Sequence, residues 1–149
     1  MNFVYTNAAR ALLAGEIDLD SGGDDIRVAI LMTNTTADTE RDVATIDAFS
    51  TLDEYDGSGY SRQALAGEGV AADNANDRGE FDATDVDFGA LGAGARNAQA
   101  LLVYKHVGAD SANIPIAYID SGTNLPFTGN GSNVSITWSA EGIIQATTT

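Results

Sequence analysis

The prediction of the fold starts from the segment Ile26-Arg27-Val28-Ala29-Ile30-Leu31-Met32. Six of its seven residues are apolar, three of them are β-branched, and Arg27 is the exception. A run of this length and composition is typical of a strand that is buried on both faces. The run therefore predicts a central, buried strand, against which the rest of the chain must pack.

From Tyr60 onward the chain predicts short strands separated by glycine, asparagine and aspartate. Residues Ala98–His106 and Ile114–Asp120 alternate between two faces, as strands do. Pro115 places the start of the second run at a sheet edge or at a first position, because proline cannot donate to a ladder. The other candidate strands are Tyr60–Leu65, Gly69–Asp73, Gly79–Ala83, Val86–Phe88, Val134–Ser139 and Ile143–Thr147.

Strands at this spacing predict a mainly β fold, an antiparallel β-sandwich or barrel-like domain with a short N-terminal helix. The 149 residues are the usual length of one domain, so we expect residues 1–149 to form a single domain. Residues 1–15 predict the helix or arm, with Thr6 as its cap and Gly15 as its stop. Its apolar residues recur at spacings of three and four: Tyr5, Ala8, Ala9, Leu12 and Leu13. Residues 16–149 would form the β-rich body.

Residues 33–59 predict a long loop within that body. Val43, Ile46, Phe49 and Leu52 recur every three residues, which allows a short helical piece. A loop this long is unusual in a compact domain and often contacts another molecule. We therefore interpret residues 33–59 as an interaction arm.

The charge of the chain bears on its partners. It has 22 acidic and 7 basic residues, for a formal net charge of −15, and only Asp110, Asp120 and Glu141 of the acidic ones follow residue 90. A negative field repels phosphate, so we expect no nucleic-acid partner and no membrane partner. The same field suits solubility, a basic partner surface or a bound cation.

The sequence also bears on the compartment. Cysteine is absent, which excludes disulfides, zinc–thiolate sites and thiol nucleophiles. The first residues lack a basic stretch followed by a long apolar run, so we expect no secretory leader. A protein of this kind would leave a cell by lysis or inside a particle.

Two acidic segments are candidate calcium sites. Asp18–Asp25 sets carboxylates beside glycines, but an EF-hand loop starting at Asp18 would place Gly22 and Ala29 at ligand positions. Asp73–Glu80 fails the same pattern because Ala75 occupies a ligand position. A solvated turn is the default interpretation of Asp18–Asp25, and a generic cation site there remains an open alternative.

The sequence shows no catalytic motif. Four carboxylates lie close together in the sequence: Glu80, Asp82, Asp85 and Asp87. A glycosidase needs two carboxyl groups on either side of a cleft, whereas the alternation of acidic and apolar residues here is typical of a half-exposed strand. His106 is the single histidine, without a nucleophile elbow, and is expected to be a structural or rim residue. Residues 89–94 lack a phosphate-binding lysine and predict a flexible connector. We therefore expect no enzyme, with no catalytic, cofactor-binding or metal-binding residues.

Several segments carry a resemblance through their order: Phe3–Thr6, Gly15–Asp20, Ile26–Leu31, Gly57–Tyr60, Asp73–Ala83, Ala100–Lys105, Pro115–Asp120, Ile136–Trp138 and Gly142–Ile144. This order, across nearly the whole chain, resembles small virion structural proteins of tailed bacteriophages. The resemblance implies a head decoration (cement) protein that binds and stabilises the major capsid protein shell as a homo-oligomer, a dimer or trimer, in a virion assembled in the host cytoplasm. Tail, head–tail connector or fibre-associated placement is the alternative.

A further alternative is a module that binds a host surface or carbohydrate. Five aromatic residues could provide a sugar-binding platform: Tyr55, Tyr60, Tyr104, Tyr118 and Trp138. The competing interpretation is that most of these rings belong to the core, and the sequence leaves the two open.

Overall fold

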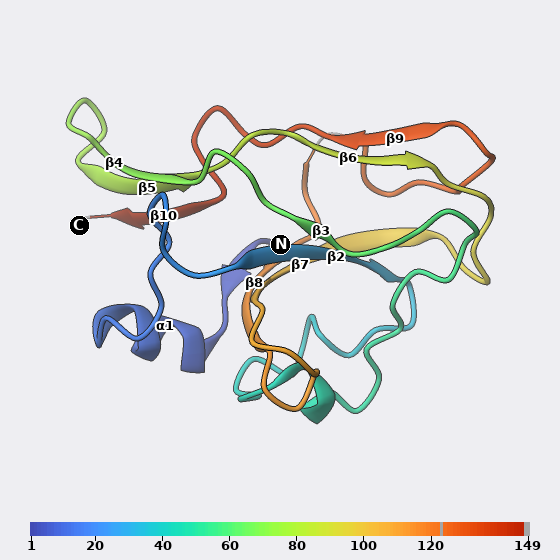
Figure 1. Ribbon diagram of the computed structural model, residues 1–149, viewed down its shortest axis with the longest axis horizontal. Helices are drawn as coiled ribbons and strands as arrows, with labels where there is room; N and C mark the ends of the chain where they lie inside the picture. The colour runs from blue at the N-terminus through green and yellow to red at the C-terminus, as the bar shows by residue number, and fades with distance from the viewer. Residues whose placement is uncertain (123, 148–149) are drawn as a thin grey trace.

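The computed structural model describes residues 1–122 and 124–147, and it confirms a mainly β fold with antiparallel sheets and a short helix near the N-terminus (Figure 1). The elements, in chain order, are β1 (Phe3–Val4), α1 (Thr6–Leu13), β2 (Ile26–Met32), the 3₁₀ turn η1 (Ile46–Ala48), β3 (Gln63–Ala64), β4 (Gly69–Asp73), β5 (Arg78–Asp82), β6 (Val86–Ala90), β7 (Ala98–Lys105), β8 (Ile114–Ile119), β9 (Asn133–Ile136) and β10 (Ile144–Thr147).

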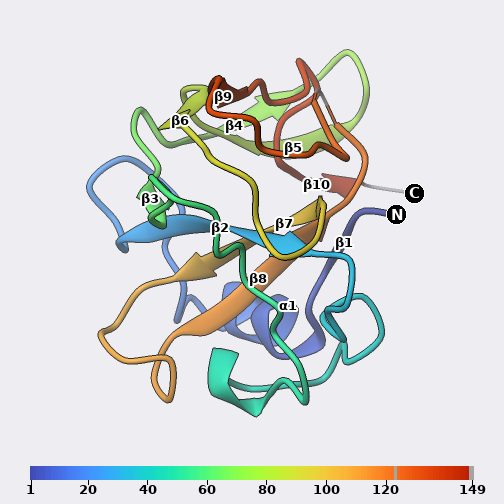
Figure 2. The same cartoon turned by 90° about the vertical axis from the view of Figure 1, so that its right-hand side faces the viewer.

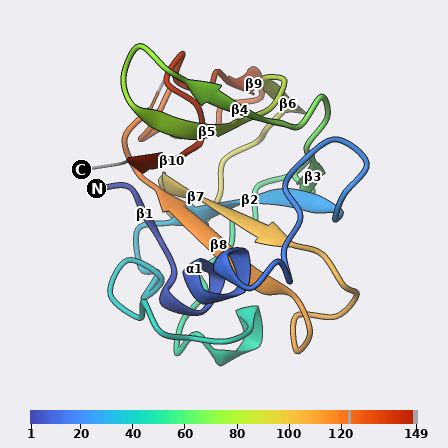
Figure 3. The same cartoon turned by 90° about the vertical axis from the view of Figure 1, so that its left-hand side faces the viewer.

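A five-stranded sheet forms the centre of the fold, in the order β1-β8-β7-β2-β3. β2 pairs with β7 along its whole length, from Ile26 opposite Lys105 to Met32 opposite Ala98. Figures 2 and 3 show that α1 and residues 33–59 cover one face of this sheet, while the smaller sheets lie over the other. β2, β7 and β8 are therefore apolar on both faces, which confirms the buried strand predicted from residues 26–32.

Two smaller sheets, β10-β5-β4 and β6-β9, make the second layer of the sandwich (Figure 1). β4 and β5 form a hairpin closed between Asp73 and Arg78, at the positions the sequence predicts to within one residue. β6 pairs with β9 across a stretch of the chain that contains β7 and β8. One hydrophobic cluster joins both layers, from Tyr5 of the N-terminal segment to Trp138 after β9.

The N-terminal helix differs in detail from the prediction. Its N-cap is Tyr5 and no side chain caps it, so the predicted role of Thr6 is wrong. Gly15 has φ +69° just beyond the helix, which confirms it as the stop. Ala8 is buried against the sheet, whereas Leu13 is 91% exposed because only one side of this short helix faces the core.

β8 corrects the expectation for Pro115. The strand lies inside the sheet between β1 and β7, and Pro115 is its second residue. It faces Tyr104 at the point where the β7–β8 register shifts. The irregular ladder accommodates a residue that has no N–H to donate.

Residues 33–59 contain η1 and no other helix or regular strand. The weak three-residue period thus corresponds to a single 3₁₀ turn at residues 46–48, where Ile46 is buried. Within the described residues, no helix is long and apolar enough to cross a membrane.

Candidate interaction site

The segment 33–59, which we call the arm, packs as an ordered layer under the sheet. Beside α1, the Tyr5 hydroxyl donates to the Ala37 carbonyl at 2.8 Å, and the Thr6 N–H donates to the Arg41 carbonyl at 2.9 Å. The Asn7 amide donates to the Asp42 carbonyl at 2.7 Å. The start of the arm is therefore fixed to the N-terminal segment, and the arm is a built surface rather than a loose loop.

Glu40 organises the arm from within. Its carboxylate accepts hydrogen bonds from the Thr36 hydroxyl at 2.7 Å and from the Ser50 N–H at 2.8 Å. These bonds, the Ser50 hydroxyl first among them, lower the pKa of Glu40 because they favour the charged form. Glu40 thereby ties Thr36, four positions before it, to Ser50, ten positions after it.

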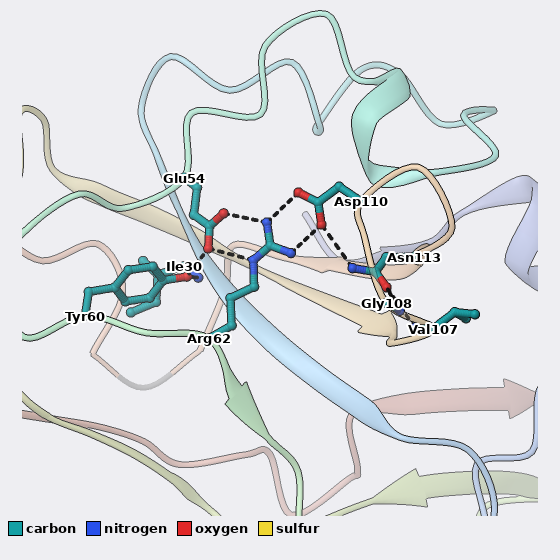
Figure 4. A network of polar contacts seen from close by, with 8 residues as sticks. All are labelled: Ile30, Glu54, Tyr60, Arg62, Val107, Gly108, Asp110 and Asn113. Carbon is teal, nitrogen blue, oxygen red and sulfur yellow. Dashed lines mark hydrogen bonds and ion pairs between the residues drawn. The ribbon is translucent and has the colours of Figure 1, made fainter.

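Arg62 joins the arm to the 107–113 loop (Figure 4). Its Nε donates to Glu54 Oε1 at 2.8 Å and its Nη2 donates to Glu54 Oε2 at 2.6 Å. Its Nη1 donates to Asp110 Oδ1 at 2.6 Å and its Nη2 donates to Asp110 Oδ2 at 2.8 Å. One guanidinium therefore binds two carboxylates, each through both oxygens, a geometry that lysine cannot supply.

The neighbours of this pair of carboxylates complete the network. The Tyr60 hydroxyl donates to Glu54 Oε1 at 2.7 Å and accepts the Ile30 N–H of β2 at 3.1 Å. The Asn113 amide donates to Asp110 at 3.0 Å, and its oxygen accepts the N–H groups of residues 107 and 108. Every carboxylate oxygen in Figure 4 has a donor, so the cluster works as a structural tie.

The titration of the cluster fits that role. Hydrogen bonds from Arg62 lower the pKa of Asp110, while the bonds to Glu54 and then to Asp110 raise the pKa of Arg62. Burial, followed by the charge of Glu54, raises the pKa of Tyr60. Arg62 is only 19% exposed and lies 5.3 Å from the centre of the Tyr104 ring. Such a group stays charged, and it neither gives up nor takes a proton near neutral pH.

The acidic turn at residues 18–25 uses its carboxylates to hold its own backbone. Asp18 accepts the Asp20 N–H at 3.0 Å, and Asp24 accepts the Asp18 N–H at 2.8 Å. Asp24 also pairs with Lys105 Nζ at 2.8 Å, and Asp25 with Arg27 at 2.7 Å. Across the described residues, no three acidic or histidine side chains gather in a way that could hold a metal ion.

Of the four carboxylates of β5, β6 and the turn between them, Asp82 is exposed and the other three each contact a separate partner. Glu80 lies against Arg78 at 2.7 Å, and Asp85 accepts the Trp138 N–H at 3.0 Å. Asp87 accepts the Asn133 amide at 2.9 Å across the β6–β9 pair. Wherever a carboxyl group of the described residues has a resolved pKa shift, the shift is downward, as opposed to the raised pKa that a general acid needs.

His106 lies at the rim of the sheet, half-buried, with its ring edge-on to Tyr104 at 6.4 Å. Its backbone N–H donates to the Asp25 carbonyl at 2.7 Å, and its Nδ1 is buried with no hydrogen-bond partner among the described residues. This placement is the structural or rim position expected from the sequence.

The five aromatic side chains do not form a surface platform. Tyr55, Tyr104, Tyr118 and Trp138 are buried, and Tyr60 is half-buried in the Arg62 network. The Tyr55 hydroxyl donates to the Gly92 carbonyl at 2.6 Å, so the 89–94 connector is packed against a ring. Residues 89 and 90 also belong to β6, so the prediction of a flexible connector at residues 89–94 is wrong. The five aromatic rings lie in the core or pack against it.

Sequence reasoning missed Arg62 and Asn113. Arg62 contacts residues 8 and 48 positions away, and Asn113 is a polar residue that is almost completely buried. Nothing in the local pattern marks either of them, because both roles depend on loops that meet only in the fold.

Searches of protein-family models, curated proteins and solved structures found no match to this chain, so the resemblance to phage virion proteins rests on motif order alone.

Proposed function

We propose that this chain is a non-enzymatic structural protein of a tailed-phage virion, and that it decorates the capsid by binding the major capsid protein shell. The proposal draws on the motif order, on the absence of an assembled catalytic cluster among the described residues, and on the charge of the surface. A structural protein presents contact loops on a rigid scaffold, and the arm is a loop of this kind because hydrogen bonds fix it to the N-terminal segment and to Arg62.

The observation that carries the proposal is how the basic side chains are used. In the described residues, six of the seven bind carboxylates of their own chain, and the seventh, Arg41, lies 4.1 Å from the centre of the Phe3 ring. Exposed acids such as Asp42, Asp82 and Asp85 enter none of the ion pairs among those residues. The surface therefore offers chiefly negative charge, which suits a basic partner surface and repels nucleic acid.

Two outward features provide contact surface for such a partner. The arm exposes residues 39, 41, 42, 44, 47 and 48 around η1. On the opposite layer, the β4–β5 hairpin exposes Val70 at 54% together with Ala71 and Ala72. The exposed residues of the arm, which include Asp42 and Asp47, lie on one side, and the small apolar patch around Val70 lies on the other. One subunit can therefore contact two neighbours.

The decisive experiment is quantitative mass spectrometry and cryo-electron microscopy of purified particles that contain this chain. We expect a copy number comparable with that of the major capsid protein and density spread over the shell. A few copies at the tail, the connector or the fibres would overturn the decoration role and place the protein in those parts. Complete absence from purified particles would overturn the virion assignment itself.

The charge argument has its own test. Purified protein added to shells that lack it should bind at low salt, and binding should weaken strongly as the salt concentration rises, because exposed charges are screened. Substitution of Asp42 and Asp47 by asparagine should weaken the binding to shells at low salt. The matched substitutions of Asp82 and Asp85 by asparagine test whether acidic residues of the opposite layer also contribute to this binding. Binding that is indifferent to salt and to all four changes would contradict a charged interface.

A further inference from the structure

Figures 2 and 3 show that β1 and β10 lie on the same side of the molecule. On this side, described residues of both layers of the sandwich line a groove. It consists of two adjoining hollows of about 520 Å³ and about 340 Å³ that share Asn2, Ile119, Ser139, Gly142 and Ile143. The larger hollow lies between β8 and the chain after β9, and the smaller one between β1 and β10. Together they form one channel along the open side of the sandwich.

The lining of this groove is uncharged. Apolar side chains make its floor and walls, among them Leu101, Ile119, Ile136, Trp138 and Ile143, and hydroxyl and amide groups make the rest. None of the described residues that line either hollow is acidic or basic. In a chain of net charge −15, an uncharged lining distinguishes the groove from the acidic surface described above. It disfavours an ionic ligand and favours a neutral, partly apolar one.

The two strands that border the groove are both sheet edges. β1 ends the five-stranded sheet and has β8 as its strand neighbour, while β10 ends the three-stranded sheet and has β5. Each strand therefore has one side that no strand of the described chain pairs with. An unpaired edge presents N–H and C=O groups that another extended segment can satisfy.

We propose that this groove binds an extended, uncharged segment of a partner protein by strand addition, with the segment lying between β1 and β10. Backbone hydrogen bonds to the strand edges hold the segment, and its alternate side chains enter the apolar hollow beside Trp138. The occupant is thus a β-strand with apolar residues at every second position and no charges. The inference does not depend on where the protein sits in a particle, and it adds a binding mode to the surfaces described above.

Trp138 provides the readout, because it is the single tryptophan of the chain and lines the groove. The probe is a short peptide with blocked ends in which threonine and valine alternate. Added to the intact protein, it should change the Trp138 fluorescence in a saturable way. The matched probe carries proline at its central position, which removes a backbone donor, and should bind about tenfold more weakly.

Variants locate the site. Ile143→Asp places a charge in the groove at a half-buried position and should weaken peptide binding at least about tenfold. Val70→Asp places the same charge on β4, the other exposed edge of that sheet, and should leave binding unchanged. Circular dichroism checks that both variants fold, and the proline-containing peptide tests the proposal on the unaltered protein in any case.

Three outcomes would overturn the proposal. Equal binding of the two peptides would mean that the groove takes apolar side chains without strand pairing. Loss of binding in Val70→Asp but not in Ile143→Asp would move the site to β4. No saturable fluorescence change with the threonine–valine peptide, or with versions that carry isoleucine or leucine in place of valine, would show that the groove does not accept a strand.

Discussion

β7 and β4 are both strands of this protein, yet they stabilise it in different ways. β7 lies between two strands and two covering layers, and its residues from Ala100 to Tyr104 are almost completely buried. β4 is the edge of a three-stranded sheet, and its residues from Val70 to Ala72 are exposed. The central sheet therefore holds the fold together through packing, while β4 depends on its turn and ladder and leaves the side chains of residues 70–72 exposed for contact.

The largest expected effect comes from a cavity in the central sheet. Leu102 of β7 is fully buried opposite Ala29 and Tyr118, so Leu102→Ala should lower the free energy of unfolding by about 3 kcal/mol. Urea denaturation measures this change. The control is Val70→Ala on β4, which should cost less than about 0.5 kcal/mol. Equal costs for the two substitutions would refute the contrast between the strands.

The next effect concerns the tie between the sheet and the arm. Arg62→Leu leaves Glu54 and Asp110 without their cation, and should cost about 2 kcal/mol, because two charged hydrogen-bonded groups lose their partner in a partly buried site. Arg10→Leu removes an ion pair with the same two-oxygen geometry to Glu16, but on the open surface. The control should barely move the urea midpoint. Equal losses in the free energy of unfolding for the two variants would show that the burial of the Arg62 cluster does not increase its contribution to stability.

Acid should loosen this tie and also a second ion pair of the arm, between Arg96 and Asp53. Hydrogen bonds from Arg96 and from Arg62 lower the pKa of Asp53 and of Asp110 in the folded protein. Groups with a lowered folded pKa stabilise fully above their ordinary pKa of about 3.9, and that stability is lost as pH falls through the folded value. The temperature of half-unfolding should therefore decrease when the pH is lowered below about 4. This decrease with pH should be smaller in Asp110→Asn, which has no carboxylate to protonate at that position. A midpoint that rises on acidification would contradict the assignment.

The smallest effects belong to the outer layer, where backbone conformation outweighs packing. Gly131 has φ +87° and open space around it, so Gly131→Ala should cost about 1 kcal/mol through strain alone. Gly69 of β4 also has open space but no positive φ, so Gly69→Ala should stabilise by about 0.5 kcal/mol. Thermal denaturation of the pair distinguishes strain from crowding. A loss at both positions would show that the space around these glycines is not free.

Much of the fold could be predicted because its signals are local. The apolar run of β2, the alternation of β7 and the glycine that ends α1 each report a property of consecutive residues. Composition likewise excluded disulfides and indicated the negative surface. These features need no knowledge of which segments meet.

The tertiary structure alone decided the rest. It determined that β1 pairs with β8 and that Leu13 faces solvent while Tyr118 is buried. It also brought Arg62, which binds the arm, to Asp110, which lies 48 positions after Arg62 in the sequence. It also placed the edges of β1 and β10 beside one uncharged groove. The physical reason is that the spacing of apolar residues along the sequence depends only on the strand or helix that contains them. The burial of a side chain and its partners depend on segments that come together only when the sheets pack.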